Sequence, residues 1–286
     1  MTPELVVRVS TGDTELACRV AGAGPVVLCV HGFPDCAASF EAVTPALVGA
    51  GYRVVCPTTR GYAPSGPARS GRYDVRALGE DLVALARHFS PEAPVRLVGH
   101  DWGAVAGYAA TALAPERFSH LATLAVPHLG AAAWRFARPA QLRRSAYIGL
   151  FQLRGLAEWR LRARDFALVH ALWRRWSPGW TCPRAHLDAV KAAIRPHPSA
   201  VLGYYRALPG ALLAPRSLLL QRTRVRSLHL HGARDGCIGV EFARGLEAAY
   251  AGPFEAQVLP GVGHFLHLEA PDAVGAHLVR FLGRGA

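Results

Sequence analysis

Short apolar strands alternate with helical stretches along most of this chain, and this alternation restricts the fold more than any other feature. Strand-like runs are followed by amphipathic stretches with helical spacing. The first two strands form a hairpin and the later ones are joined through helices, so the pattern predicts a mostly parallel sheet covered on both faces. The expected strands are residues 4–10, 16–21, 26–30, 53–56, 95–98 and 120–126, and the expected helices are 37–49, 75–89 and 104–113.

The middle of the chain interrupts this alternation. Residues 129–224 read as several amphipathic helical stretches, rich in arginine and tryptophan and broken at prolines. Strands are expected again at 225–231 and 255–259, with helices at 240–250 and 272–282. We therefore predict an α/β domain with an eight-stranded sheet, made of residues 1–128 and 225–286, and a helical cap inserted at residues 129–224.

Composition favours a globular protein without a disulfide framework. The chain has 286 residues, of which 51% are hydrophobic, enough to bury a large core. The beginning has no signal-peptide pattern and no apolar run is long enough to span a membrane, so we expect a cytoplasmic location. The six cysteines show no C-x-x-C spacing, so neither disulfides nor a zinc site is expected.

The positive charge of the chain lies in its middle third. The formal net charge is +12, and residues 134–226 carry 18 basic against three acidic side chains. No nucleic-acid-binding motif accompanies this charge, so we expect no nucleic-acid partner. Two interpretations stay open: a solvated cationic face, with Lys191 as the only lysine among many arginines, or a surface that attracts an acidic substrate, carrier or membrane.

The stretch Gly99-His100-Asp101-Trp102-Gly103 joins an expected buried strand to an expected helix. It has the G-x-S-x-G pattern of a nucleophile elbow, with Asp101 in place of serine. Glycines suit this pattern because the strained turn tolerates no Cβ close to the nucleophile or the neighbouring strand. Taken alone, an aspartate at the start of a helix also fits an ordinary helix cap.

Two further polar residues follow the ends of expected strands. Asp235 lies in LHLHGARDG and His264 in VLPGVGHFLH. The carboxyl ends of parallel strands meet at one edge of a sheet, and the order Asp101, Asp235, His264 is that of nucleophile, acid and histidine in the α/β-hydrolase triad. His267 is the nearest rival base, but it falls where a helix should already have begun.

A fourth piece is the stretch His31-Gly32-Phe33-Pro34, which follows the expected strand at 26–30. The backbone N–H groups of Phe33 and Trp102 are both expected to point at one small volume beside Asp101. Such a pair of donors predicts an oxyanion hole.

Together these segments resemble the epoxide hydrolases of the α/β-hydrolase fold. The resemblance covers nearly the whole chain and rests on five motifs: HGFP, RGYAPSG at 60–66, GHDWG, GARD and GVGHFLHLEAP. These enzymes place a helical cap between the sixth and seventh core strands, which matches residues 129–224. They also carry two cap tyrosines that donate hydrogen bonds to the epoxide oxygen. The matching residues are Tyr147, ahead of Phe151-Gln152, and Tyr205, directly before Arg206.

Tyr204 is adjacent to Tyr205 and could be confused with it, but Tyr205 ranks first because it alone directly precedes the arginine. Both cap tyrosines also fit an ordinary amphipathic core. The resemblance implies that the substrate contacts Phe33, Trp102, Tyr147 and Tyr205. It further implies that Asp101 opens the epoxide to form an ester and that His264, oriented by Asp235, activates water to release a diol. A serine would leave a stable ether, whereas an ester can be hydrolysed. No metal or organic cofactor is required.

Other activities remain as alternatives. Haloalkane and haloacid dehalogenases use the same Asp-His-Asp triad, and the Trp102 indole suits a halide. However, the haloalkane enzymes commonly have Asn directly after His-Gly, where this chain has Phe33. Asp101 disfavours a serine esterase, and a non-hydrolytic ligand receptor or a biosynthetic cyclase on this fold is the third possibility.

The tryptophans of the cap do not identify the substrate, because two interpretations of them are possible. They either line an apolar pocket for aromatic or lipid-like epoxides or form the cap's own core. The sequence does not specify the oligomeric state. These tryptophans are Trp134, Trp159, Trp173, Trp176 and Trp180.

Overall fold

The computed structural model describes residues 5–214 and 216–285, and within them eight strands form a single sheet. The strand order is β1-β2-β4-β3-β5-β6-β7-β8; β2 runs antiparallel to both of its neighbours and all other pairs are parallel. The predicted mostly parallel, eight-stranded sheet is therefore confirmed. The strands are β1 (Leu5–Ser10), β2 (Glu15–Ala21), β3 (Val26–Val30), β4 (Arg53–Pro57), β5 (Val95–His100), β6 (Phe118–Leu124), β7 (Arg226–Gly232) and β8 (Phe254–Leu259).

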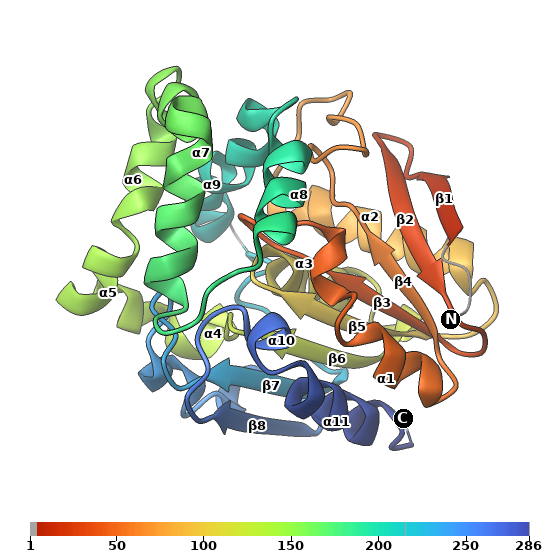
Figure 1. The fold of residues 1–286 in the computed structure, drawn as a ribbon. Helices are drawn as coiled ribbons and strands as arrows, with labels where there is room; N and C mark the ends of the chain where they lie inside the picture. The colour runs from red at the N-terminus through yellow and green to blue at the C-terminus, as the bar shows by residue number, and fades with distance from the viewer. Residues whose placement is uncertain (1–4, 215, 286) are drawn as a thin grey trace.

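Helices cover both faces of the sheet (Figure 1). α1 (Thr44–Gly49) and α11 (Pro271–Leu282) pack together on one face, and α2 (Val75–Phe89) and α3 (Trp102–Leu113) pack together on the other. Every residue of β3 is buried, as expected for a central strand of valine, leucine and cysteine with helices on both sides. The Asp74 side chain caps α2 by accepting a hydrogen bond from the Ala77 N–H.

Two predicted helices differ from the structure. The stretch 37–49 divides into a 3₁₀ turn at Ala37–Phe40 and α1, because Pro45 lacks a backbone N–H and suits only the first turn of a helix. The stretch 240–250 forms two short 3₁₀ turns, Val240–Ala243 and Glu247–Ala249. Gly245 lies between them with a φ of +64°, outside helical geometry.

The segment between β6 and β7 is helical, as predicted, and we call residues 129–224 the helical insert. Its longer helices gather beyond the ends of β6 and β7, away from both chain termini (Figure 1). The backbone of α7 leaves helical geometry at residues 163–166. The helices are α4 (Leu129–Ala132), α5 (Pro139–Arg144), α6 (Ala146–Gln152), α7 (Leu156–Trp176), α8 (Arg184–Ile194) and α9 (Pro198–Leu213), with a 3₁₀ turn at Ala133–Ala137.

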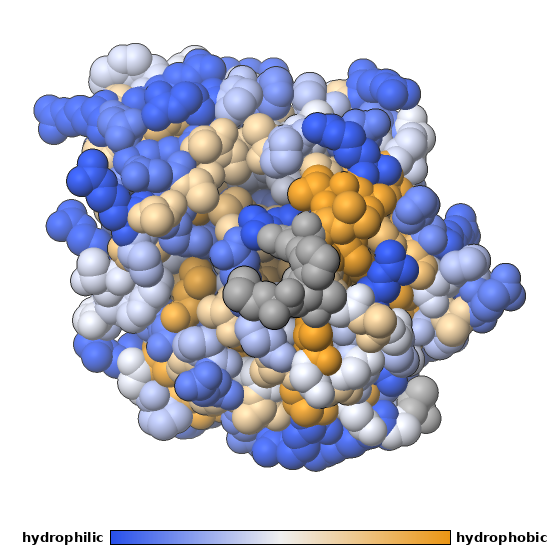
Figure 2. Space-filling model, turned by 45° about the vertical axis from the view of Figure 1, so that its right-hand side comes forward, coloured by the Kyte–Doolittle hydropathy of each residue, from blue (hydrophilic) through white to orange (hydrophobic). Residues whose placement is uncertain are grey.

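The surface is mixed in character. On the face drawn in Figure 2, hydrophilic side chains dominate the outline and hydrophobic ones gather in patches between them. Leu5 and Val6 of the edge strand β1 are more than half exposed. Among the described residues, no helix combines the length and apolar character needed to cross a lipid bilayer.

Candidate active site

Asp101 occupies the sharp turn between β5 and α3. Its backbone has a φ of +51° and a ψ of −117°, a conformation that costs energy for any residue with a Cβ. Within the described part of the chain its side chain makes no helix-capping hydrogen bond. Instead, its Oδ1 atom accepts a hydrogen bond of 2.8 Å from the Phe33 N–H. The carboxylate therefore faces the HGFP segment rather than its own helix.

Two glycines allow this turn to approach its neighbours. A Cβ on Gly32 would collide with the Asp101 carboxylate and would lie 2.6 Å from the Trp102 nitrogen. A Cβ on Gly103 would collide with the carbonyl oxygen of Val30, at the end of β3. The close contact between β3, the HGFP segment and the start of α3 thus brings the Phe33 and Trp102 amides together beside Asp101.

The structure brings Asp235 and His264 to the same place. Nδ1 of His264 lies 2.8 Å from Asp235 Oδ2, and Nε2 of His264 lies 3.6 Å from Asp101 Oδ2. The other oxygen of Asp235 accepts hydrogen bonds from the backbone N–H groups of Cys237 and Ile238, at 2.7 and 2.9 Å. Because the two backbone N–H groups hold one oxygen of Asp235, its other oxygen fixes the His264 ring, with Nε2 toward Asp101.

Charge governs the protonation of His264. Burial opposes the charged imidazolium, but the carboxylates of Asp235 and Asp101 outweigh this effect and raise the pKa of His264 to about 10. Burial also opposes the ionised form of Asp235, yet His264 and the surrounding hydrogen bonds lower the pKa of this carboxyl. The three side chains therefore behave as one coupled unit.

The backbone around His264 is held by two residues that the sequence analysis did not single out. The Glu269 carboxylate accepts hydrogen bonds from the Gly263 and Phe265 N–H groups, at 2.7 and 3.1 Å. It also accepts one from the Ser177 hydroxyl at 2.5 Å, and that hydroxyl accepts one from the His264 N–H at 3.1 Å. Ser177 directly follows α7, so the helical insert contributes to holding the catalytic loop.

A cavity of about 500 Å³ opens beside Asp101, between the sheet and the helical insert. Its polar lining groups are few, and the rest of its wall is aliphatic or aromatic. The lining residues are Asp101, Trp102, Val105, Val126, Leu129, Phe136, Leu142, Ser145, Ala146, Tyr147, Ile148, Gly149, Tyr205, Leu208, Leu212, Cys237 and Ile238.

Tyr147 of α6 and Tyr205 of α9 both reach this cavity, and their ring centroids lie 5.6 Å apart. The Tyr205 hydroxyl is buried and has no hydrogen-bond partner among the described residues, while the Tyr147 hydroxyl lies 3.8 Å from the Cys237 sulfur. Burial raises the pKa of both phenols, so both stay protonated as donors. Phe33 lies behind this pair, with its ring 5.3 Å from that of Tyr205.

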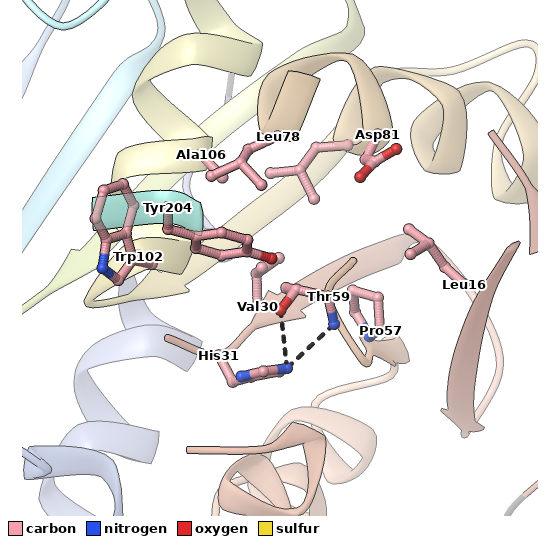
Figure 3. A pocket seen from close by; sticks show the side chains of 11 residues that line it. Leu16, Val30, His31, Pro57, Thr59, Leu78, Asp81, Trp102, Ala106 and Tyr204 are labelled. Carbon is pink, nitrogen blue, oxygen red and sulfur yellow. Dashed lines mark hydrogen bonds between the residues drawn. The ribbon is translucent and has the colours of Figure 1, made fainter. Parts of the chain in front are cut away.

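Tyr204 lies elsewhere. Its ring points into a separate small cavity of about 10 Å³, beside Trp102 and Leu78 (Figure 3). Its hydroxyl donates a hydrogen bond of 2.7 Å to the Arg60 carbonyl oxygen. In the same view His31 Nε2 accepts a hydrogen bond from the Thr59 N–H. Tyr204 and His31 therefore hold the loop after β4 in place.

The tryptophans of the helical insert do not line the large cavity in the described residues. Trp173 and Trp176 are buried; Trp173 stacks on Phe265 with centroids 3.5 Å apart, and Trp176 packs against His264. Trp159 is 65% exposed. The side chain of Trp134 falls outside the described residues. Trp173 and Trp176 therefore pack in a core rather than along the cavity, but their partners include Phe265 and His264, which lie outside the helical insert.

Comparison with known proteins agrees with this geometry. Residues 25–271 match the model of the alpha/beta hydrolase fold family. Epoxide hydrolase A of Mycobacterium tuberculosis (strain ATCC 25618 / H37Rv) is 31% identical over 92% of this chain and 93% of its own length. The chain belongs to the epoxide hydrolases of the α/β-hydrolase fold.

Further relatives extend the likeness. Epoxide hydrolase 3 of Xenopus tropicalis is 28% identical over 90% of this chain and 71% of its own. The crystal structure of epoxide hydrolase A from Mycobacterium thermoresistibile superposes with a TM-score of 0.82 at 28% identity, covering 99% of this chain and 98% of that one. The expected fold and family are thus confirmed.

Proposed function

We propose that this epoxide hydrolase converts an apolar epoxide to a vicinal diol through an ester on Asp101. The observation that carries the proposal is the convergence on one cavity of the Asp101 carboxylate and two protonated phenols, with His264 and Asp235 directly behind. The proposal treats residues 1–128 and 225–286 as the catalytic core and residues 129–224 as its cap. Neither step needs a cofactor.

The first step is ring opening. An oxygen of Asp101 attacks a ring carbon, and the electron pair of the breaking C–O bond moves to the epoxide oxygen. Tyr147 and Tyr205 donate hydrogen bonds to that oxygen as charge develops on it, which lowers the barrier most in the transition state. The carbon is then joined to Asp101 as an ester, and the alkoxide takes a proton from one of the two phenols. That phenol is reprotonated by the proton that His264 releases before the second step.

The second step is hydrolysis of that ester. Ester formation removes the negative charge of Asp101, one of the two charges that raise the pKa of His264. His264 can then lose its proton and serve as a general base for water. The water attacks the ester carbonyl, the Phe33 and Trp102 amides stabilise the resulting oxyanion, and the diol leaves with the proton returned by His264.

The cavity favours an uncharged, apolar substrate. None of its described lining residues is an arginine or a lysine, so the basic character of the helical insert does not extend into the cavity. The helices α5, α6 and α9 contribute five aliphatic side chains to the wall: Leu142, Ala146, Ile148, Leu208 and Leu212. Trp102 borders the cavity beside Asp101, so we propose that it contacts the substrate together with Tyr147 and Tyr205, with Phe33 supporting Tyr205 from behind.

Intact-mass spectrometry of a His264→Gln variant tests the proposal. The variant is mixed with styrene oxide or with 1-chlorohexane, and its mass is compared with that of the double variant that also carries Asp101→Ala. We expect an increase equal to the whole mass of styrene oxide, absent in the double variant, because ring opening survives while ester hydrolysis stops.

Two results would contradict the proposal. An adduct with 1-chlorohexane alone, equal to the mass of 1-chlorohexane less that of hydrogen chloride, would make the protein a dehalogenase. An adduct that persists when Asp101 is replaced would place the nucleophile elsewhere, and the ester mechanism on this residue would be wrong.

A further inference from the structure

A cluster of buried acid and histidine side chains lies behind the catalytic loop, outside the large cavity. Asp35 follows the HGFP segment, His100 ends β5 and His267 lies in α10 (Leu266–Glu269). All three have no exposed surface. One potential ligand atom from each lies within 4.8 Å of the others. Segments distant in sequence thus bring three metal-binding side chains to one point.

The hydrogen bonds around this cluster leave lone pairs facing inward. Nε2 of His100 lies 3.0 Å from the His264 carbonyl oxygen, to which it can only donate, so the lone pair of His100 stays on Nδ1. Asp35 uses Oδ1 for the Cys36 N–H at 2.8 Å and for His186 Nε2 at 2.9 Å, which leaves Oδ2. Among the described residues, His100 Nδ1, Asp35 Oδ2 and both ring nitrogens of His267 have no hydrogen-bond partner.

Such a concentration of unpaired buried groups is unusual, because native interiors pair nearly all of their polar atoms. The arrangement also has a known chemical use. A histidine that binds a metal commonly donates its second ring N–H to a backbone carbonyl, which fixes the tautomer with the free lone pair toward the ion. His100 has this arrangement, with the His264 carbonyl as the acceptor.

We propose that Asp35, His100 and His267 bind a single divalent transition-metal ion, with zinc the best match to two imidazoles and one carboxylate. With bonds of about 2.1 Å, two ligand atoms of one zinc ion stand at most about 4.2 Å apart. His267 Nε2 and Asp35 Oδ2 lie 3.8 Å apart, within this limit. The overlapping trio of Asp35, Cys36 and His186 is less suitable, because His186 Nε2 and Asp35 Oδ1 already pair with each other at 2.9 Å.

The ion has a structural role rather than a catalytic one. None of its three ligands lines the described wall of the large cavity, so the ion does not meet substrate. It ties the segment after β3 to the end of β5 and to α10. Through His100 it also holds the carbonyl of His264, and so the loop that presents the catalytic imidazole.

Metal analysis of tag-free protein tests this inference. The protein is stripped with a chelator, loaded with Zn²⁺ or Co²⁺, desalted and assayed for metal by mass spectrometry. We expect one ion per chain in the native sequence and a loss of that ion in His267→Gln. His120→Gln is the matched control, because His120 is also fully buried with an unpartnered Nε2 in the described structure, yet lies outside the cluster.

Thermal melting supplies a second measurement. Zn²⁺ should raise the melting temperature of the stripped native protein and of His120→Gln, but not that of His267→Gln, because a ligand stabilises only the state that binds it. Retention of no metal by the native protein would overturn the inference. Equal retention by His267→Gln would overturn it as well. Ester formation on Asp101 does not depend on either result.

Discussion

His264 lies in the loop between β8 and α10 and His267 lies three residues later, in α10 itself, and the surroundings of these two histidines differ. His264 faces Asp101, with carboxylates at 2.8 and 3.6 Å from its two nitrogens and a pKa raised to about 10. His267 faces the interior without a hydrogen-bond partner in the described residues, and burial holds its pKa well below the usual value. Partners, and not position in the motif, therefore distinguish the catalytic base from its neighbour.

The largest effect should come from Asp235→Asn. An amide in place of the carboxylate removes the charge that orients His264 and can favour the wrong tautomer, so we expect ester hydrolysis to slow by about 10⁴-fold. Single-turnover kinetics with styrene oxide measures the decay of the ester. His267→Gln should slow the same step by less than about tenfold, because a general base contributes about 10²–10⁴-fold and His267 is not the base. Equal losses in the two variants would remove the distinction between the histidines.

The next effect concerns the phenols. Tyr147→Phe and Tyr205→Phe should each slow ring opening by about 10²-fold, since removal of one preorganised donor to a developing oxyanion has this magnitude. Rapid-mixing measurement of ester formation tests this. Tyr204→Phe is the matched control: it removes the bond to Arg60 and should cost about 1 kcal/mol of stability, with ring opening unchanged. If ring opening slowed in Tyr204→Phe and not in Tyr205→Phe, the catalytic phenol would be Tyr204 and the choice of Tyr205 would be wrong.

Glu269→Gln examines how the loop is held. The variant weakens the hydrogen bonds that the carboxylate accepts from Gly263, Phe265 and Ser177. We expect a loss of about 2 kcal/mol in the free energy of unfolding, typical of hydrogen bonds to a charged group. Urea denaturation measures it, and kcat should fall while KM stays constant. An unchanged stability and kcat would show that the carboxylate does not hold the His264 loop.

The smallest expected effect is a shift in the pKa of His264. The Asp101 carboxylate helps to hold the pKa of His264 at about 10, so Asp101→Asn should lower this pKa. Below the unfolded value of about 6.5 the charged form of His264 stabilises the native protein fully, and this stabilisation is lost as the pH rises toward 10. In the variant this stabilisation should be smaller, and its loss, which still begins near the unfolded pKa, should be complete at a lower pH. NMR titration of the imidazole tests this, and an unchanged pKa would mean that Asp235 alone sets it.

The sequence was sufficient for the residues that follow strands. Asp101, Asp235 and His264 directly follow or lie close behind β5, β7 and β8, and parallel strands place their carboxyl ends together. The Tyr-Arg pair in the sequence already favoured Tyr205 over Tyr204. The structure adds where each side chain lies: successive residues of a helix project about 100° apart, and only Tyr205 lines the large cavity in the described residues. A motif can name both candidates but cannot show which cavity each one faces.

Contacts between segments distant in the sequence were harder to predict. Ser177, at the end of α7, and Glu269, in α10, meet beside the backbone of His264. No sequence motif predicts this contact. Glu269 did lie in the GVGHFLHLEAP stretch, so its place beside the histidine was a usable signal. The cluster of Asp35, His100 and His267 likewise depends on tertiary packing, and the spacing of the cysteines gave no indication of it.

The oxygen that Asp101 contributes to the product tests the central claim most directly. Excess enzyme is mixed with styrene oxide in H₂¹⁸O so that each active site turns over only once. If Asp101 forms an ester, the new diol oxygen comes from the carboxylate, so the diol should contain no ¹⁸O and peptide mapping should find the label in Asp101. A diol that carries ¹⁸O after one turnover would mean that water attacks the epoxide directly, and the ester mechanism would be wrong.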